Sequence, residues 1–159
     1  MKDYQKICDK HLDFLKMELG DNLVSIVLYG SVARGRPRDD SDIDLLIVCE
    51  DLPEGRFERS RIFIDIEDRV RKVLGINPMD FPYISTVLKT RKEAAYHSPL
   101  YLDMVEDAKI LFDKGGFIQK VFSDIKKRLE ELGAKRIWIG DKWYWDLKPD
   151  FKPGEVVEI

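Results

Sequence analysis

Hydrophobic residues recur along the chain with two different spacings, which predict helices alternating with strands. Helical spacing predicts three amphipathic helices, each followed by a glycine that can end it. These helices cover residues 7–19, 62–74 and 117–132. A nearly unbroken hydrophobic run over residues 23–29 predicts a strand buried on both faces, and residues 42–48 predict a second strand. Strand-forming residues after Pro82 predict a third within 78–88. This order of elements predicts the α/β class.

The second half of the chain continues with shorter elements. A capping box at residues 90–93 predicts a short helix, and Ser98-Pro99 begins another that runs to about Ala108. Residues 109–112 are a candidate strand. Two further runs, 136–139 and 142–145, flank Gly140-Asp141 and predict a β-hairpin.

The last residues, 147–159, contain two prolines and predict an extended arm that docks on this or a neighbouring chain. We predict one domain over residues 1–159. Its core with the candidate motif covers 1–108, and the C-terminal helix, hairpin and tail cover 109–159.

The predicted hairpin concentrates aromatic residues, namely Trp138, Trp143, Tyr144 and Trp145. Rings on a hairpin can stack on a nucleobase, but aromatic hairpins more often cover a hydrophobic core. Both roles stay open from the sequence.

A polar loop between the first two strands contains the candidate chemistry. Gly30 leaves the backbone open to a ligand, and Ser31 offers a hydroxyl and an N–H at the start of a predicted one-turn helix that ends at Gly35. That corner suits a phosphate group. The loop also provides three guanidinium groups that could reach a polyphosphate, those of Arg34, Arg36 and Arg38.

The second strand opens with two carboxylates. Asp42 and Asp44 are two residues apart, so on a strand they project to the same side, while Ile43 and Leu45 project to the other. Two carboxylates this close repel unless a cation lies between them, and oxygen ligands suit Mg²⁺. We therefore interpret Asp42 and Asp44 as ligands of Mg²⁺, with Mn²⁺ as the alternative metal.

Two other motifs with similar spacing do not fit. A P-loop needs Lys and then Ser or Thr where this chain has Arg36-Pro37. An EF-hand needs glycine where this chain has Leu45.

Gly30-Ser31, Gly35 and Ser41-Asp42-Ile43-Asp44 resemble the Gly-Ser-x(9)-Ser-Asp-x-Asp signature of the polymerase-β nucleotidyltransferase superfamily, and the short chain resembles its minimal stand-alone members. The resemblance implies a small mixed β-sheet with helices packed mainly on one face. It also implies transfer of a nucleoside monophosphate from an NTP, which we expect to be ATP, with release of pyrophosphate. Nucleotide binding is assigned to Gly30, Ser31, Arg34 and Ser41.

Members of this superfamily commonly have a third carboxylate on the next strand, close to the same metal. Asp80 is the one acid available there, and we assign it as the third catalytic carboxylate and metal ligand beside Asp42 and Asp44. The alternative is that Asp80 only forms a turn next to Pro82.

Charged residues make up 36% of the chain, yet the formal charge is only −3, which disfavours a long nucleic acid as partner. The polar N-terminus and the lack of a long apolar run predict neither signal peptide nor membrane span, so we expect a cytosolic protein. Cys8 and Cys49 are predicted to be buried thiols, and His11 and His97 to have core or surface roles.

The sequence does not identify the acceptor. A small molecule, a tRNA-like end and a hydroxyl of a partner protein are all open, and a homo-oligomer is one further option. Minimal members of the superfamily often resemble the antitoxin of a toxin–antitoxin pair. The second hypothesis is therefore an interaction protein that binds nucleotide and a small helical partner with little or no catalysis.

Overall fold

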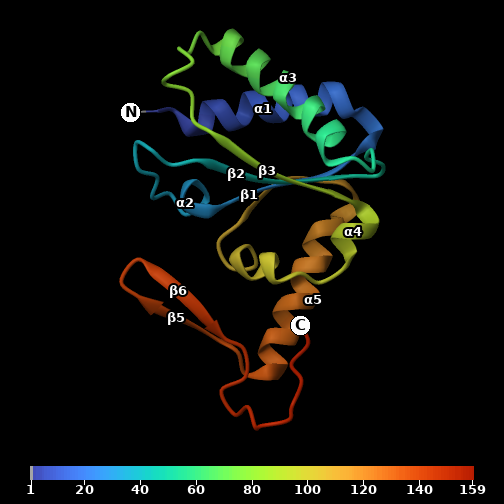
Figure 1. The fold of residues 1–159 in the computed structure, drawn as a ribbon, viewed down its shortest axis with the longest axis vertical. Helices are drawn as coiled ribbons and strands as arrows, with labels where there is room; N and C mark the ends of the chain where they lie inside the picture. Colours follow the sequence, from blue (N-terminus) through green and yellow to red (C-terminus); the bar gives the residue numbers. More distant parts are fainter. Residues whose placement is uncertain (1) are drawn as a thin grey trace.

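The computed structural model describes residues 2–159 and contains a mixed four-stranded sheet (Figure 1). The strands are β1 (Leu23–Tyr29), β2 (Ile43–Cys49), β3 (Ile84–Thr90) and β4 (Lys109–Asp113), in the spatial order β3-β2-β1-β4. β1 runs antiparallel to β2 and β4, and β2 runs parallel to β3. The predicted α/β class and mixed sheet are confirmed.

Helices cover both faces of the sheet rather than mainly one. α1 (Tyr4–Leu19) and α3 (Arg56–Leu74) lie on one face, and α4 (Arg91–Ala95), a 3₁₀ turn η2 (Pro99–Asp103) and α5 (Phe117–Leu132) lie on the other (Figure 1). The reason lies in the central strands. In β2, Ile43, Leu45 and Ile47 face the α1/α3 core, while Leu46 and Val48 face the α5 core. A sheet that is apolar on both faces must be covered on both.

The remaining elements are short. A 3₁₀ turn η1 (Gly20–Asn22) leads into β1, α2 (Gly30–Ala33) follows β1, and η3 (Lys114–Gly116) leads into α5. The predicted capping box is present before α4, where the Thr90 hydroxyl accepts from the Glu93 N–H and the Glu93 carboxylate accepts from the Thr90 N–H. The helix expected from Ser98 to Ala108 is only the 3₁₀ turn η2.

The predicted hairpin forms a separate two-stranded sheet of β5 (Lys135–Ile139) and β6 (Lys142–Asp146). The Trp145 Nε1–H donates to the Leu102 carbonyl at 3.0 Å, and the Trp145 ring packs against the α5 core. The tail docks on its own chain, because Ile159 packs on the same core and the Arg128 Nε–H donates to the Glu158 carbonyl at 2.9 Å. Within residues 2–159, no helix combines the length and the apolar character that crossing a membrane would need.

Candidate active site

Asp42 and Asp44 lie at the start of β2, in the middle of the sheet. Asp44 is the second residue of β2 and stands between Tyr29 of β1 and Ser85 of β3 in the strand register. Asp42 is exposed and Asp44 is half-buried. Burial raises the pKa of Asp44, the negative charge of Asp42 raises it further, and the Ser85 hydroxyl and the Arg34 guanidinium act in the opposite direction. The two carboxylates therefore interact, as the motif predicts.

The backbone of Gly30 lies directly against the Asp44 carboxylate. Gly30 has a φ of +75°, and a Cβ built on it would come within 2.1 Å of the Asp44 Oδ2. Only glycine leaves this space to the carboxylate and accepts this backbone angle without strain. The turn that begins the predicted phosphate site and the predicted metal ligand are therefore immediate neighbours.

Ser41 closes the loop between α2 and β2. Its Oγ accepts a hydrogen bond from the Arg38 N–H at 2.8 Å and lies 3.2 Å from the Ser31 Oγ. Tyr4 of α1 holds the same segment from behind, because its hydroxyl donates to the Arg38 carbonyl at 2.8 Å. Burial raises the pKa of Tyr4, and the acidic residues of the loop and strand start, including Asp42, add to that effect. Tyr4 was not among the predicted site residues, because a tyrosine at the start of a helix belongs to no local motif.

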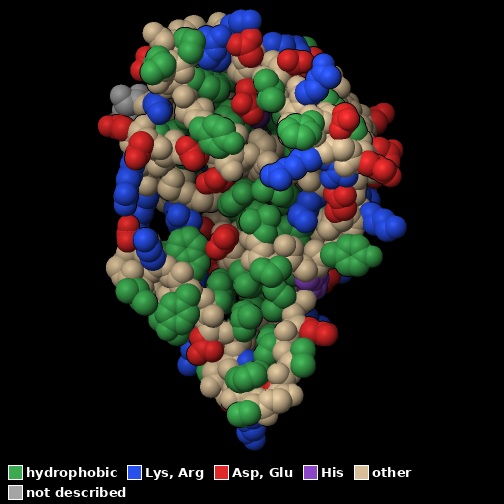
Figure 2. Space-filling model, viewed as in Figure 1, with side chains coloured by type: hydrophobic (Ala, Val, Ile, Leu, Met, Phe, Trp, Pro, Cys, Tyr) green, Lys and Arg blue, Asp and Glu red, His purple; other side chains and the backbone are tan. Residues whose placement is uncertain are grey.

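The three loop arginines have different surroundings. Arg34 is half-buried and stacks on Trp143 of the hairpin, with its guanidinium carbon 4.6 Å from the ring centroid. Arg36 and Arg38 are exposed, and Arg38 pairs with Asp141 of the hairpin at 3.1 Å. A cleft of about 400 Å³ separates loop and hairpin and is lined by Arg34, Arg36, Asp107, Trp138 and Gly140. In Figure 2, basic side chains along one edge of the molecule lie next to the hydrophobic side chains of the hairpin.

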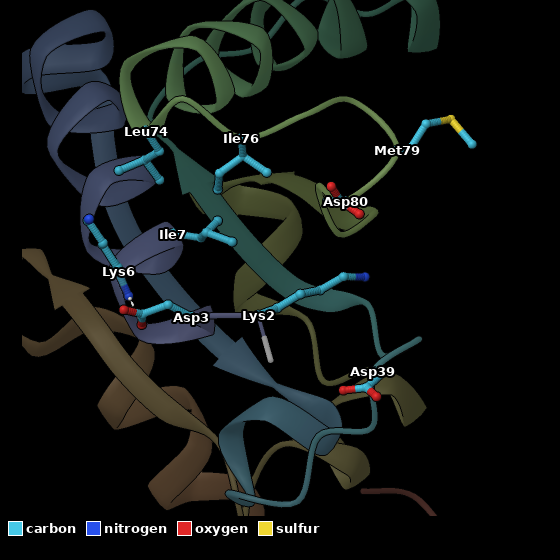
Figure 3. Close-up of a pocket in the computed structure, with 9 residues that line it drawn as sticks. All are labelled: Lys2, Asp3, Lys6, Ile7, Asp39, Leu74, Ile76, Met79 and Asp80. Atoms are coloured by element: carbon cyan, nitrogen blue, oxygen red, sulfur yellow. Dashed lines mark hydrogen bonds between the residues drawn. The ribbon is translucent and has the colours of Figure 1, made fainter.

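Asp80 is not brought to the carboxylate pair. It is exposed and lies in a turn between α3 and β3, where its N–H donates to the Asn77 carbonyl at 2.9 Å. It lines a groove of about 700 Å³ together with Lys2 and Asp39, and Figure 3 shows Asp80 and Asp39 on two separate segments at the rim of that groove. Within residues 2–159, no group of three His, Cys, Asp or Glu side chains lies close enough together to hold a metal ion by itself.

The register of β3 explains the placement of Asp80. β3 begins at Ile84, which pairs with Ile43, so the β3 residue beside Asp44 is Ser85. Asp80 is four residues before the strand and cannot occupy that position. The structure therefore presents two carboxylates and one hydroxyl where three carboxylates were expected, and the turn-forming alternative describes Asp80 better.

The remaining predicted core residues need no catalytic role. Cys8 and Cys49 are buried free thiols, and burial raises the pKa of each to about 11. His11 is buried in α1 without a hydrogen-bond partner, and burial lowers its pKa to about 4. His11 is therefore a neutral core residue at neutral pH.

The region that contains these residues is similar to known proteins. Residues 8–101, which include Gly30, Asp42 and Asp44, match the family described as "Nucleotidyltransferase domain". A protein of Methanocaldococcus jannaschii named "Putative protein adenylyltransferase MJ1305" is 31% identical over 148 residues, which is 92% of this chain and 95% of that protein.

A solved structure shows a similar fold. It is the spectinomycin adenyltransferase AAD(9) from Enterococcus faecialis with ATP and spectinomycin, which is 16% identical with a TM-score of 0.56 over 83% of this chain and 66% of that one. The resemblance seen in the motif is confirmed by the family match and by the relative, and the chain belongs to the nucleotidyltransferase domain family of the polymerase-β superfamily.

Proposed function

We propose that the protein is a Mg²⁺-dependent nucleotidyltransferase that transfers AMP from ATP to a hydroxyl group of a protein. The observation that supports this most directly is the contact between the Gly30 backbone and the Asp44 carboxylate, with Asp42 beside it. A phosphate-binding corner and two metal ligands would then lie close enough for one triphosphate to reach both. The choice of ATP and of a protein acceptor rests on the name of the M. jannaschii relative.

The residues present suit Mg²⁺ bound together with a nucleotide. Mg²⁺ is usually held by one or two carboxylates plus substrate phosphates, and Asp42 and Asp44 provide two carboxylates. Burial and then the charge of Asp42 raise the pKa of Asp44, so a cation beside the pair would favour its ionised form. When bound, the metal would neutralise charge on the reacting phosphate. Mn²⁺ could take the same ligands.

The loop would hold the rest of the triphosphate. Gly30 and Ser31 provide the first N–H groups of α2, which have no partner within that short helix, and Ser31 adds a hydroxyl. Arg34 provides a guanidinium that can pair with two phosphate oxygens. Ser41 acts indirectly in this proposal, since its hydrogen bonds keep the loop closed against Ser31.

In the proposed reaction the oxygen of the acceptor hydroxyl attacks the α-phosphorus of ATP. The bond from the α-phosphorus to the oxygen that bridges it to the β-phosphate breaks, and pyrophosphate leaves with that electron pair. The proton of the hydroxyl passes to water, because the described residues place no third carboxylate at the pair to accept it. Catalysis would then depend on positioning and charge neutralisation more than on a protein base.

Labelled ATP tests the proposal. The protein is incubated with ATP labelled at the α-phosphate, Mg²⁺ and a cell extract, and labelled proteins are separated by electrophoresis. Label is expected with Mg²⁺ and not with EDTA, and the double variant Asp42→Asn with Asp44→Asn should transfer none. Label that persists in the double variant would overturn the proposal. Calorimetry with ATP should likewise show binding only when Mg²⁺ is present.

A second candidate function has one observation in its favour, which is the position of Asp80 away from the pair. A site with two carboxylates could bind Mg²⁺ and nucleotide while catalysing poorly. The protein would then act as an interaction protein of the antitoxin kind, with a small helical protein as partner. Tight binding of ATP without transfer of label to any protein would favour this function over the first.

A further inference from the structure

In Figure 1 the hairpin β5–β6 lies below α2 and the motif loop that follows it. Side chains join the two segments at two points, Arg34 with Trp143 and Arg38 with Asp141. We propose that Trp143 is a positioning residue that holds Arg34 ready for the β- and γ-phosphates of the nucleotide. The inference rests on the proposed function and deepens it, since it gives a binding role to a part of the chain outside the matched family region, residues 8–101.

Arg34 connects the hairpin to the carboxylate pair. Its guanidinium lies 4.6 Å from the centre of the Trp143 ring. Arg34 also directly follows α2, whose first residue, Gly30, lies against the Asp44 carboxylate. Asp44 alternates with Ile43 and Leu45 along β2, so its side chain faces the side of the sheet that α5 covers. Trp145 anchors the hairpin on that same side. Arg34 therefore lies where a polyphosphate bound beside Asp44 would need a cation.

The Trp143 ring is itself held in place from the hairpin side. Arg136 lies 5.5 Å from the Trp143 ring centre and 4.9 Å from that of Trp138, and it is fixed by an ion pair with Asp107 at 2.6 Å. The rings of Trp138 and Trp143 are 5.1 Å apart. Arg34, Arg136 and Trp138 already contact the Trp143 ring. The ring therefore stacks with guanidinium groups and is not free to stack on a nucleobase.

The second contact between loop and hairpin is weaker. The ion pair of Arg38 and Asp141 joins two side chains that are 76% and 72% exposed, and such pairs contribute little because water and salt screen them. Trp143 and Arg34 are both half-buried. The stacking contact is therefore the one that can hold a cation in place before the ligand arrives.

A cation that is held in advance loses less side-chain freedom when the ligand binds, which raises affinity without a new contact. Loss of the stacking partner should weaken binding of ATP about tenfold. AMP has neither a β- nor a γ-phosphate, so its affinity should not change. If Trp143 acts by holding Arg34, its loss should weaken binding of ATP but not of AMP. If the hairpin contacts the nucleoside instead, binding of both should weaken.

The test compares two variants of similar bulk. Trp143→Leu keeps an apolar side chain without a ring, and Trp143→Phe keeps a ring on which a guanidinium can stack. Dissociation constants for ATP and AMP are measured by calorimetry with Mg²⁺, and thermal melts check that each variant is folded. Trp143→Leu should bind ATP about tenfold more weakly and AMP as before, and Trp143→Phe should restore most of the ATP affinity.

Tyr144→Ala provides the matched control, because Tyr144 is the next residue of β6 and is 50% exposed. It should leave ATP affinity unchanged. In an Arg34→Ala background, Trp143→Leu should have no further effect, since the residue that it positions is gone. Equal weakening of ATP and AMP, or full effect of Trp143→Leu without Arg34, would overturn the inference. Failure of the wild type to bind ATP at all would instead overturn the proposed function.

Discussion

Gly30→Ala tests whether the contact between the Gly30 backbone and Asp44 organises the site. The Cβ of alanine would lie 2.1 Å from the Asp44 Oδ2, whereas ordinary contact begins at 3.4 Å. The carboxylate must therefore move by about 1.3 Å, the difference of these two distances, or α2 must move away from it. A misplacement of about 1 Å at reacting groups can lower a rate by roughly 10²-fold.

The stability cost of this substitution can be separated from its effect on the site. Alanine at a φ of +75° costs about 1–2 kcal/mol, and the more restricted unfolded chain returns up to about 1 kcal/mol of that. Gly35 offers a matched control, because its φ is +69° and a Cβ on it would meet no atom within 4 Å. Both variants should lose a similar small amount of stability, but only Gly30→Ala should displace Asp44.

The assay combines thermal melts with transfer of label from ATP in the presence of Mg²⁺. Gly30→Ala should lower transfer by roughly 10²-fold or more, while Gly35→Ala should stay much closer to the wild type. Activity in Gly30→Ala equal to that in Gly35→Ala would refute the reasoning, since it would mean that the position of the Asp44 carboxylate does not matter. A much larger loss of stability in Gly30→Ala would show that α2 moves rather than the carboxylate.

Three further predictions concern the carboxylate pair, His11 and Asp80. Replacing Asp42 and Asp44 together by Asn should abolish ATP binding in Mg²⁺ and leave the melting temperature in metal-free buffer equal or higher, because the burial of a charge at Asp44 and its repulsion by Asp42, which both raise the pKa of Asp44, are gone; a large drop would mean a structural role. Burial lowers the pKa of His11 from 6.5 to about 4 in the folded chain. On acidification the unfolded chain is therefore protonated at a higher pH than the folded chain, and the free energy of unfolding falls as pH drops from 6.5 towards 4. His11→Leu should remove roughly 2–3 kcal/mol of that fall between about pH 7.5 and pH 4.5, measured by denaturant unfolding, and unchanged pH dependence would contradict it. Asp80→Ala should change neither ATP binding nor transfer, and a strong loss of transfer would show that the turn moves Asp80 to the pair when substrate binds.

Much of the fold follows from local patterns. β1 has the predicted bounds, 23–29, because its residues are apolar on both faces and cannot form an exposed element. α5 has the predicted bounds, 117–132, because helical spacing and the following glycine agree. Helices on both faces are consistent with the same strands, because β1 and β2 have apolar residues on both sides. The expectation of helices mainly on one face came from the family resemblance rather than from this pattern.

Strand register is the part of the site that local patterns do not determine. The distance along the chain between α3 and β3 allows Asp80 either in a turn or on the strand, and a shift of a few residues decides between them. In the structure β3 begins after Pro82, and the parallel pairing of Ile43 with Ile84 places Ser85 beside Asp44. The contact between Arg34 and Trp143 likewise joins residues far apart in sequence, and neither residue has a local pattern that predicts it.

The charges around Asp44 indicate whether metal and nucleotide would bind separately or together. Burial and Asp42 make the ionised form of Asp44 unfavourable, while Arg34 and the Ser85 hydroxyl partly offset this. In the proposed function, Mg²⁺ would have two carboxylates instead of three as protein ligands and would need phosphate oxygens to complete its shell. The nucleotide in turn needs the cation, because its phosphates are repelled by Asp42 and Asp44. In the proposed function each therefore binds better with the other, and Mg²⁺ should enter the site as a complex with ATP rather than as a resident ion.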